Sequence, residues 1–280
     1  MAHKTYATPF PVLHAASLLN QKSRIEKFDM ALRKVVTPES YVIDLGTGSG
    51  VLALLAAKAG ARKVSAVDIN PECIDYARKA AIMNGLTDRV EWFVGHFSEF
   101  HPSEHADVVV CEMLSPMMLV EQQVTACSHA VRHLLKRNGC MIPQAATAWV
   151  VPVESPVMWN RFEICELRFP RVPQTAASDD VRDLSAAQKL VTFDFSTLSS
   201  LDAVDRELSF EILETGTLHG FVGFFESMLL DDIMLYMNDG WRELLLPLDE
   251  PANVVRGQAV KVHIRYTPGR FDSLSLRLKP

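Results

Sequence analysis

The stretch Tyr41-Val42-Ile43-Asp44-Leu45-Gly46-Thr47-Gly48-Ser49-Gly50 decides how the first half of the chain is expected to fold. Its first five residues have the apolar, β-branched composition of a buried strand. The three glycines allow a tight turn and a close approach of the backbone to a ligand. An apolar helix at 51–59 follows, and Gly60 ends it as a common C-terminal cap. Strand, glycine turn and helix together predict the first unit of a parallel α/β sheet.

The same alternation of strand and helix continues to about residue 143. Further strands are expected at 63–67, 90–94, 106–110 and 140–143, with helices at 71–83 and 120–137 and a helical N-terminal segment that ends at Pro38. Asn70-Pro71 is a typical helix start, and Asn138-Gly139 is expected to end the helix before the last strand. Residues 1–147 are therefore predicted to form N-terminal helices plus a Rossmann-like domain.

After residue 147 the pattern changes to short strands, several of which alternate apolar and polar residues. Turn pairs such as Asp239-Gly240 and Pro268-Gly269 separate them, and helix signals nearly vanish. Residues 148–280 are predicted to form an antiparallel β-barrel or sandwich. The less regular segment 156–187 is expected to project from that domain.

Composition excludes several classes of protein. With a net charge of −6 and no basic stripe, the chain is not expected to bind nucleic acid. No apolar run approaches the ~18 residues that cross a membrane, so no membrane association is expected. The five cysteines are scattered without a CxxC pair, which favours reduced thiols in the cytoplasm. His129 and His133 have the spacing of two metal ligands but lack a third, so no metal site is predicted.

The glycine loop has chemical features that favour one cofactor. No Lys-Ser or Lys-Thr follows it, which excludes a nucleoside-triphosphate loop. Asp44 would repel a pyrophosphate but can pair with the ammonium of an amino-acid cofactor, and Asp68 ends the next strand where a carboxylate can accept ribose hydroxyls. Asp44, Gly46, Gly48 and Asp68 therefore predict S-adenosylmethionine binding. A nicotinamide cofactor and a purely structural loop remain as alternatives.

Two glutamates, Glu112 and Glu121, follow the strand at 106–110. Pro116 disfavours a helix between them, because the residue before a proline avoids the α region. A turn there would bring both carboxylates to the open end of the sheet, where they would suit a cationic, planar substrate. The alternative is structural: Glu112 caps a loop, and Glu121 begins a helix with a favourable charge. Met113 is a candidate for lining the methyl-transfer pocket, although methionine commonly fills gaps in packing.

These motifs resemble those of the protein arginine methyltransferases, and the resemblance covers the chain from about Leu18. Residues 42–50 are similar to the family's VLDVGSGTG motif, and residues 56–64 nearly repeat its wording. The spacing of Glu112 and Glu121 matches the family's double-glutamate loop. Residues 219–226, His-Gly-Phe-Val-Gly-Phe-Phe-Glu, look most like the type II, symmetric-dimethylating branch.

The resemblance implies a class I methyltransferase domain followed by a β-barrel, and roles for particular residues. It implies that Arg24 binds the cofactor carboxylate and that Trp241 lies near the substrate. His96 and Phe97 fall where the adenine ring is expected. Glu112 and Glu121 would hold a guanidinium. The segment 156–187 takes the place of the family's dimerisation arm, with Val157, Met158, Trp159 and Phe162 as apolar contacts, so a homodimer is expected.

One departure from the family bears on the substrate. The family's Thr-His-Trp loop reads Asp239-Gly240-Trp241 here, so the imidazole is replaced by Gly240, which is expected to leave open space. This favours free arginine or a small guanidino metabolite, methylated once, over a protein arginine. A methyltransferase of another small molecule or of a ribosomal protein is a further alternative, and a non-catalytic interaction module is a third.

Overall fold

The computed structural model describes residues 10–176, 180–198 and 202–279. A parallel sheet of five strands, in the order β3-β2-β1-β4-β5, forms the centre of its first half. The strands are β1 (Tyr41–Leu45), β2 (Lys63–Asp68), β3 (Val90–Val94), β4 (Ala106–Cys111) and β5 (Leu135–Ile142). All of β1 is buried, as expected for a central strand covered on both faces.

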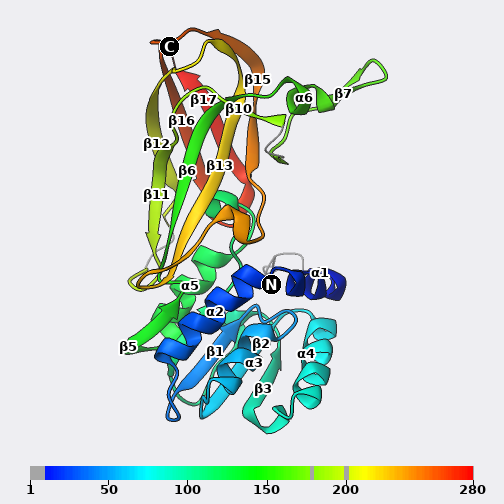
Figure 1. Ribbon diagram of the computed structural model, residues 1–280, viewed down its shortest axis with the longest axis vertical. Helices are drawn as coiled ribbons and strands as arrows, with labels where there is room; N and C mark the ends of the chain where they lie inside the picture. The colour runs from blue at the N-terminus through cyan, green and yellow to red at the C-terminus, as the bar shows by residue number, and fades with distance from the viewer. Residues whose placement is uncertain (1–9, 177–179, 199–201, 280) are drawn as a thin grey trace, which may run out of the picture.

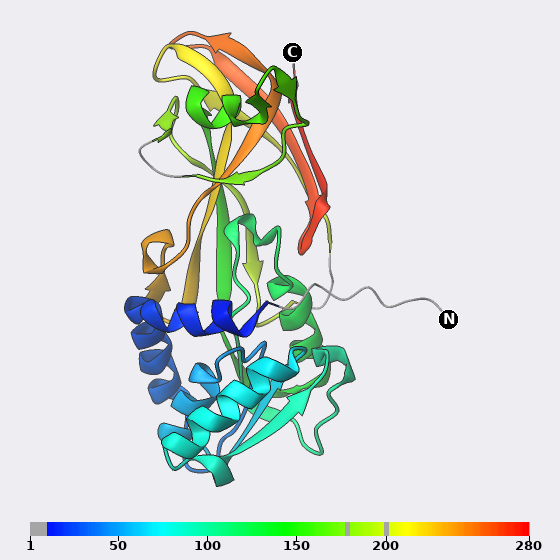
Figure 2. The same ribbon diagram turned by 90° about the vertical axis from the view of Figure 1, so that its right-hand side faces the viewer.

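Helices cover both faces of this sheet (Figures 1 and 2). The α-helices are α1 (Val12–Ser17), α2 (Lys22–Val35), α3 (Val51–Lys58), α4 (Pro71–Met83) and α5 (Gln123–His133), and the 3-10 turns are η1 (Leu18–Asn20), η2 (Thr87–Arg89), η3 (Phe97–Glu99) and η4 (Pro116–Met118). The side chain of Asn70 accepts a hydrogen bond from Glu72 N at 2.9 Å and caps α4, with Pro71 in its first turn. The predicted Rossmann-like fold is confirmed.

Helix α5 is shorter than the sequence pattern predicts at both ends. It ends at His133, and the Asn138-Gly139 pair lies inside β5 instead of ending the helix. The pairing of β5 with β4 is irregular between Ala106 and Val108, so the Asn-Gly signal marks a bulged strand. At its start, the residues before Gln123 form a separate loop rather than a helical turn.

Antiparallel sheets form the second half, which confirms the predicted barrel-like domain. One sheet has the order β10-β6-β13-β15-β9, with β11 also on β6 and β14 also on β13, and the other is β12-β16-β17. Their strands are β6 (Ala145–Glu154), β9 (Gln174–Thr175), β10 (Arg182–Asp183), β11 (Gln188–Asp194), β12 (Val204–Glu211), β13 (Gly216–Leu230), β14 (Ile233–Leu235), β15 (Leu244–Val254), β16 (Ala259–Thr267) and β17 (Arg270–Lys279), and η7 (Met237–Asp239) precedes β15. Strand β6 begins just after the parallel sheet ends.

An arm projects from the barrel between β6 and β9 (Figure 1). It consists of α6 (Pro156–Trp159), η5 (Asn160–Phe162) and the hairpin of β7 (Glu163–Ile164) and β8 (Leu167–Arg168). The prediction that Val157, Met158, Trp159 and Phe162 form its apolar contact surface is mostly wrong. Met158 and Phe162 are buried, and the Trp159 indole donates to Leu248 O at 2.9 Å. These side chains anchor the base of the arm, while its exposed apolar residues are Val157, Ile164, Leu167, Phe169 and Val172.

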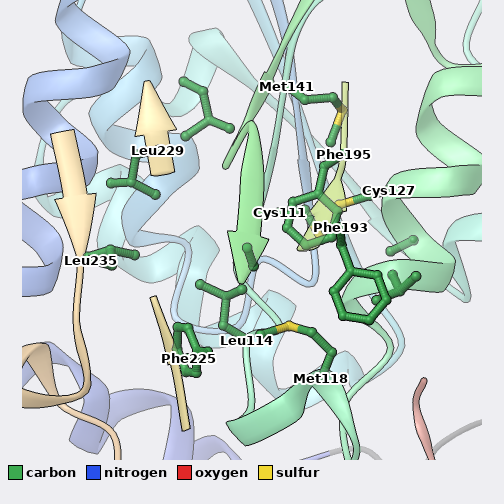
Figure 3. Close-up of a cluster of buried hydrophobic side chains, with 14 of the residues drawn as sticks. Cys111, Leu114, Met118, Cys127, Met141, Phe193, Phe195, Phe225, Leu229 and Leu235 are labelled. Carbon is green, nitrogen blue, oxygen red and sulfur yellow. The ribbon is translucent and has the colours of Figure 1, made fainter. Parts of the chain in front are cut away.

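The larger of two hydrophobic clusters continues from the parallel sheet into the barrel. Figure 3 shows part of it, where Leu114 and Met118, from the loop after β4, meet Phe225 of β13 and Phe193 of β11. The loop that carries the two glutamates is therefore packed between the domains, and both domains determine its shape. No helix in the described ranges is long and apolar enough to cross a membrane.

Candidate active site

The glycine loop after β1 adopts backbone conformations that favour glycine. Gly46, Gly48 and Gly50 have φ angles of +73°, +52° and +81°, in the left-handed region. A Cβ atom on Gly46 would lie 3.1 Å from the Met113 side chain, so Met113 packs directly against the loop. Asp68 joins the loop to β2, because its Oδ2 accepts a hydrogen bond from Gly48 N at 2.8 Å. The loop is thus a backbone cradle at the carboxyl ends of β1 and β2.

Asp44 is a buried carboxylate with one oxygen still available. Its Oδ2 accepts hydrogen bonds from Thr47 Oγ1 at 2.6 Å and from Ala53 N at 3.0 Å. Within the described part of the chain, its Oδ1 has no hydrogen-bond partner. Burial raises the pKa of Asp44 to about 7, and the charges of Asp68 and Glu112 add to that rise. An unpartnered buried carboxylate oxygen suits a cationic ligand group such as the ammonium of S-adenosylmethionine.

The loop from Leu114 to Glu121 turns back on itself after β4. The Ser115 hydroxyl accepts hydrogen bonds from Val120 N and Glu121 N, each at 3.2 Å. Met117 and Met118 have positive φ angles of 57° and 54°, which are unfavourable for side-chain-bearing residues. As expected from Pro116, no continuous helix joins the glutamates. The fold brings the two carboxylates close enough for the charge of Glu112 to raise the pKa of Glu121.

The barrel holds this loop in its unfavourable conformation. Tyr266 OH donates to Met117 O at 2.7 Å, and Gly269 N donates to Met118 O at 2.9 Å. A Cβ on Gly223 of β13 would lie 2.1 Å from Met117 Sδ, so only glycine leaves room for that side chain. The second domain therefore contributes directly to the position of Glu121.

Arg24 lies in the site between Glu112 and Trp241. Its Nη1 donates to Glu112 Oε2 at 3.0 Å, its Nη2 donates to Gly240 O at 3.1 Å, and its guanidinium carbon is 3.8 Å from the centre of the Trp241 ring. The Trp241 indole in turn donates to Leu114 O at 2.9 Å. Among the described residues, none accepts a hydrogen bond from Arg24 Nε. That donor is available to an anionic group, as its expected contact with the cofactor carboxylate requires.

When both glutamates are ionised, they carry more negative charge than Arg24 can balance. Burial raises the pKa of Glu112, and Arg24 opposes that rise. Burial and the charge of Glu112 raise the pKa of Glu121 to about 8. The Glu112 side chain keeps 16% of its exposed area, so a ligand can still reach it although protein atoms surround it closely. A second cation is the ligand that these two carboxylates would stabilise.

The space beside Gly240 is filled, contrary to the expectation from the sequence. A Cβ atom at this position would lie 2.6 Å from Gln21 Oε1 and 2.8 Å from Arg24 Nη2. Gly240 also has a φ of +129°, which side chains rarely adopt. Gln21 and Arg24 occupy the space where a side chain at position 240 would begin. Sequence reasoning missed Gln21 because nothing in its local pattern separates it from an ordinary polar residue before a helix.

A buried glutamine, Gln123, holds the backbone around Glu112 through hydrogen bonds. Sequence reasoning missed this residue as well. Gln123 Oε1 accepts a hydrogen bond from Met113 N at 2.7 Å, and its Nε2 donates to Cys111 O at 2.9 Å. Gln123 replaces the strand pairing that β4 loses at its end, and so fixes the residues on both sides of Glu112. The only signal in the sequence is a glutamine among apolar neighbours near a helix start.

The two aromatic residues expected at the adenine lie next to each other. The rings of His96 and Phe97 are 4.0 Å apart, and His96 Nδ1 and Nε2 contact Ser98 Oγ at 2.8 Å and Gln122 Oε1 at 3.2 Å. Phe97 is buried and also packs on His129, with ring centres 5.6 Å apart. Across the described ranges, no three His, Cys, Asp or Glu side chains gather in a way that could hold a metal ion.

Comparison with known families divides the chain at the same place as the fold. Residues 29–142 match the family described as ribosomal protein L11 methyltransferase (PrmA). Residues 145–268 match the PRMT5 oligomerisation domain. The first match spans the parallel-sheet domain and the second spans the barrel, so the chain is similar to a methyltransferase in its first half and to the PRMT5 oligomerisation domain in its second.

Curated relatives agree with this combination. The chain is 25% identical over 272 residues to the arginine N(omega)-methyltransferase of Streptomyces achromogenes subsp. streptozoticus, covering 90% of this chain and 75% of that protein. It is 26% identical over 263 residues to protein arginine N-methyltransferase 6 of Danio rerio, covering 83% and 74%. An uncharacterised protein of Methanocaldococcus jannaschii is 37% identical over 140 residues, which is 50% of this chain and about half (53%) of that relative.

A solved structure has the same fold. The Trypanosoma brucei PRMT1 enzyme-prozyme heterotetrameric complex with AdoHcy superposes with a TM-score of 0.80 at 21% identity, covering 94% of this chain and 91% of that one. With the glycine cradle and the free oxygen of Asp44, these matches indicate S-adenosylmethionine as the cofactor. Over most of its length the chain is similar to arginine methyltransferases.

Proposed function

We propose that this protein is an S-adenosylmethionine-dependent N-methyltransferase of a guanidino nitrogen, with free arginine or a small guanidino metabolite as its substrate. The observation that carries the proposal is the environment of Arg24. A guanidinium already lies in this site, with a carboxylate at its edge and an aromatic ring against its face. Glu121 adds a second carboxylate that lacks an equivalent cation, and a substrate guanidinium would supply it.

The cofactor would be held by groups at the carboxyl ends of β1 and β2. Asp44 would pair with its ammonium, the Gly46 and Gly48 backbone would lie against its amino-acid portion, and Asp68 would accept its ribose hydroxyls. His96 and Phe97 would flank its adenine, and Arg24 would contact its carboxylate. Bound there, S-adenosylmethionine supplies an electrophilic methyl group. The available oxygen of Asp44 and the available Nε of Arg24 support this assignment.

Glu112 and Glu121 would act on the charge distribution of the substrate. A guanidinium stays protonated at neutral pH, and delocalisation makes its nitrogens poor nucleophiles. Two carboxylates that accept hydrogen bonds from the other N–H groups would draw the positive charge toward themselves and leave electron density on the attacking nitrogen. They would also hold that nitrogen in line for attack, while Met113 and Trp241 line the space around it. Burial and the charge of Glu112 raise the pKa of Glu121 to about 8, and a bound guanidinium would favour its ionised form. The ionised Glu121 would then be able to accept the released proton.

The choice between free and protein-bound arginine rests on similarity to relatives. The open space that the sequence suggested beside Gly240 is filled by Gln21, so it no longer supports a small substrate. Similarity across 90% of this chain to an enzyme named arginine N(omega)-methyltransferase supports free arginine. Protein arginine is the second candidate, supported by the Danio rerio relative. The ribosomal-protein alternative is less well supported, because its family matches only the cofactor domain.

A methyl-transfer assay tests the substrate directly. The protein is incubated with S-adenosylmethionine and either free L-arginine or a Gly-Arg-rich peptide, and products are identified by mass spectrometry. We expect free L-arginine to be methylated faster, with monomethylarginine as the main product. Rapid dimethylation of the peptide, with free arginine left unmodified, would instead favour protein arginine as the substrate.

We also propose that the protein is a homodimer formed through the arm. The exposed Ile164 and Leu167 at the tip of the β7–β8 hairpin support this, because apolar side chains on a projecting segment favour burial against another surface. The match of residues 145–268 to a family described as an oligomerisation domain is consistent with the same assembly.

A further inference from the structure

We infer that Asp239 is a positioning residue, which fastens the loop carrying Trp241 to helix α2 and thereby keeps Trp241 in the active site. The inference rests on the proposed function, since it concerns how that site is assembled. It assigns to Asp239, Lys27 and Ser23 a task that no motif in the sequence indicates.

Asp239 is a buried carboxylate with three hydrogen-bond donors around it. Its Oδ2 accepts from Lys27 Nζ at 2.6 Å and from Tyr236 N at 2.8 Å, and its Oδ1 accepts from the Ser23 hydroxyl. Ser23 and Lys27 are four residues apart, so they lie one above the other on the same face of α2. The carboxylate therefore spans one turn of the helix and ties it to η7.

The two residues after Asp239 also contact helix α2. Gly240 O accepts a hydrogen bond from Arg24 Nη2 at 3.1 Å, and the Trp241 ring lies against the same guanidinium at 3.8 Å. Arg24 follows Ser23 directly in the helix. Residues 239–241 and the first turns of α2 are thus joined by several contacts. In Figure 2 the short orange turn before β15 lies near the blue helix α2. Without the hydrogen bonds of Asp239, the Trp241 ring would lose its fixed position against the Arg24 guanidinium.

The charge of Asp239 makes this connection strong. Burial alone would raise its pKa, but the hydrogen bonds from Lys27, Ser23 and Tyr236 N lower it below its ordinary value. The residue is ionised at neutral pH, and its side chain is only 4% exposed against 28% for Lys27. Removing Lys27 would leave a buried carboxylate without its counter-ion, which is far less stable than the pair.

A second ion pair between α2 and the barrel provides a matched control. Lys34 Nζ lies 2.8 Å from Asp232 Oδ1, near the other end of the same helix, with side chains 45% and 83% exposed. Asp232 follows β13, and its side chain accepts a hydrogen bond from Lys34. This pair also joins α2 to the second half of the chain, but at the turn between β13 and β14, so it should have no effect on Trp241.

The experiment compares Asp239→Asn, Lys27→Met, Lys27→Arg and Lys34→Met in the full-length protein. Misplacing a site residue by about 1 Å can cost roughly 10²-fold in rate. We expect Asp239→Asn and Lys27→Met to lower kcat by roughly 10- to 100-fold while the affinity for S-adenosylmethionine changes only a few-fold. Lys27→Arg should restore most of the rate, and Lys34→Met should keep the wild-type rate. If Asp239→Asn does not fold, the two Lys27 variants still test the positioning role, because the Lys27 side chain is partly exposed.

A double-mutant comparison separates positioning from general stability. In a Trp241→Phe background, Asp239→Asn should cost little further rate, because the residue through which Asp239 acts has already been changed. Full activity of Asp239→Asn and Lys27→Met, or losses that add to that of Trp241→Phe, would overturn the inference. The activity of Glu112→Gln distinguishes a failure of the positioning role from a failure of the proposed function. If this variant is inactive while Asp239→Asn is fully active, only the positioning role fails; if it is active, the proposed function fails.

Discussion

The guanidinium carbon of Arg24 lies 3.8 Å from the centre of the Trp241 ring, and Nη1 of the same side chain donates to Glu112 Oε2 at 3.0 Å. A cation against an aromatic face, with a carboxylate at its edge, is a stable arrangement for a planar guanidinium. Arg24 therefore balances one of the two glutamates before a substrate arrives, and leaves Glu121 as the carboxylate without an equivalent cation.

Arg24→Lys tests the importance of this arrangement. A lysine ammonium cannot stack on Trp241 and also reach both Glu112 and Gly240 O, so we expect turnover to fall roughly 10-fold or more and cofactor binding to weaken. Arg33→Lys on the same helix is the control, because Arg33 is exposed and forms an ion pair with Asp29 at 2.7 Å. Wild-type kinetics for Arg24→Lys in a methyl-transfer assay would contradict this role.

Tyr266→Phe tests the contribution of the barrel to the position of Glu121. Loss of the hydrogen bond to Met117 O should destabilise the fold by about 1 kcal/mol and also lower kcat, because it frees a loop with two unfavourable backbone conformations. Tyr41→Phe is the matched control, since its buried hydroxyl contacts Ser65 Oγ at 2.8 Å away from the loop. Both variants should lose stability in thermal unfolding, but only Tyr266→Phe should lose rate. Equal rates would refute the barrel's contribution.

Local patterns predicted the elements whose residues depend mainly on their own neighbours. The buried strand and glycine turn at 41–50 and the helix start at Asn70-Pro71 need no distant partner, and the structure has them as expected. Asn138-Gly139 shows the opposite case. The pair is a helix-ending signal on its own, but pairing with β4 extends the strand through it.

The details of the site depend on contacts between distant parts of the chain. From the sequence, Gly240 was expected to leave open space beside the substrate. In the structure, Gln21, which lies far away in the sequence, fills that space. Met158 and Phe162 suggested an exposed contact surface, whereas the barrel buries them. Spacing alone placed Glu112 and Glu121 together, because a proline-interrupted turn of that length leaves few other paths.

The pKa of Glu121 predicts how stability depends on pH. Its value of about 8 in the folded protein lies well above the roughly 4.3 of an unfolded chain. Its contribution to stability is fully present below about pH 4.3 and is lost as the pH rises toward 8, because over this range the unfolded chain releases the proton while burial keeps the folded carboxyl group protonated. Glu121→Gln should therefore unfold at a higher temperature than the wild type at pH 8, with a smaller difference at pH 5. A difference that does not change with pH would show that Glu121 has an ordinary pKa.

The arm variant Ile164→Glu with Leu167→Glu tests the proposed dimer. Two charges on the exposed hairpin should prevent burial of this surface without disturbing the folded core. Light scattering at micromolar concentration should give about twice the 31.2 kDa chain mass for the wild type and a single chain mass for the variant. Val255→Glu, at an exposed apolar position outside the arm, is the control and should stay dimeric. A wild-type particle of 31.2 kDa would refute the dimer.

The central claim is that Glu112 and Glu121 act on the charge of a guanidino substrate. Its most direct test is the turnover of Glu112→Gln and Glu121→Gln, which keep the shape of each side chain and remove its charge, with Glu104→Gln at an exposed pair with Arg62 as the control. Each site variant should lose roughly 10²-fold or more in rate, as expected for a lost electrostatic stabiliser, while calorimetry finds cofactor affinity within a few-fold of wild type. Retention of more than about a tenth of the wild-type rate by either site variant would contradict the account.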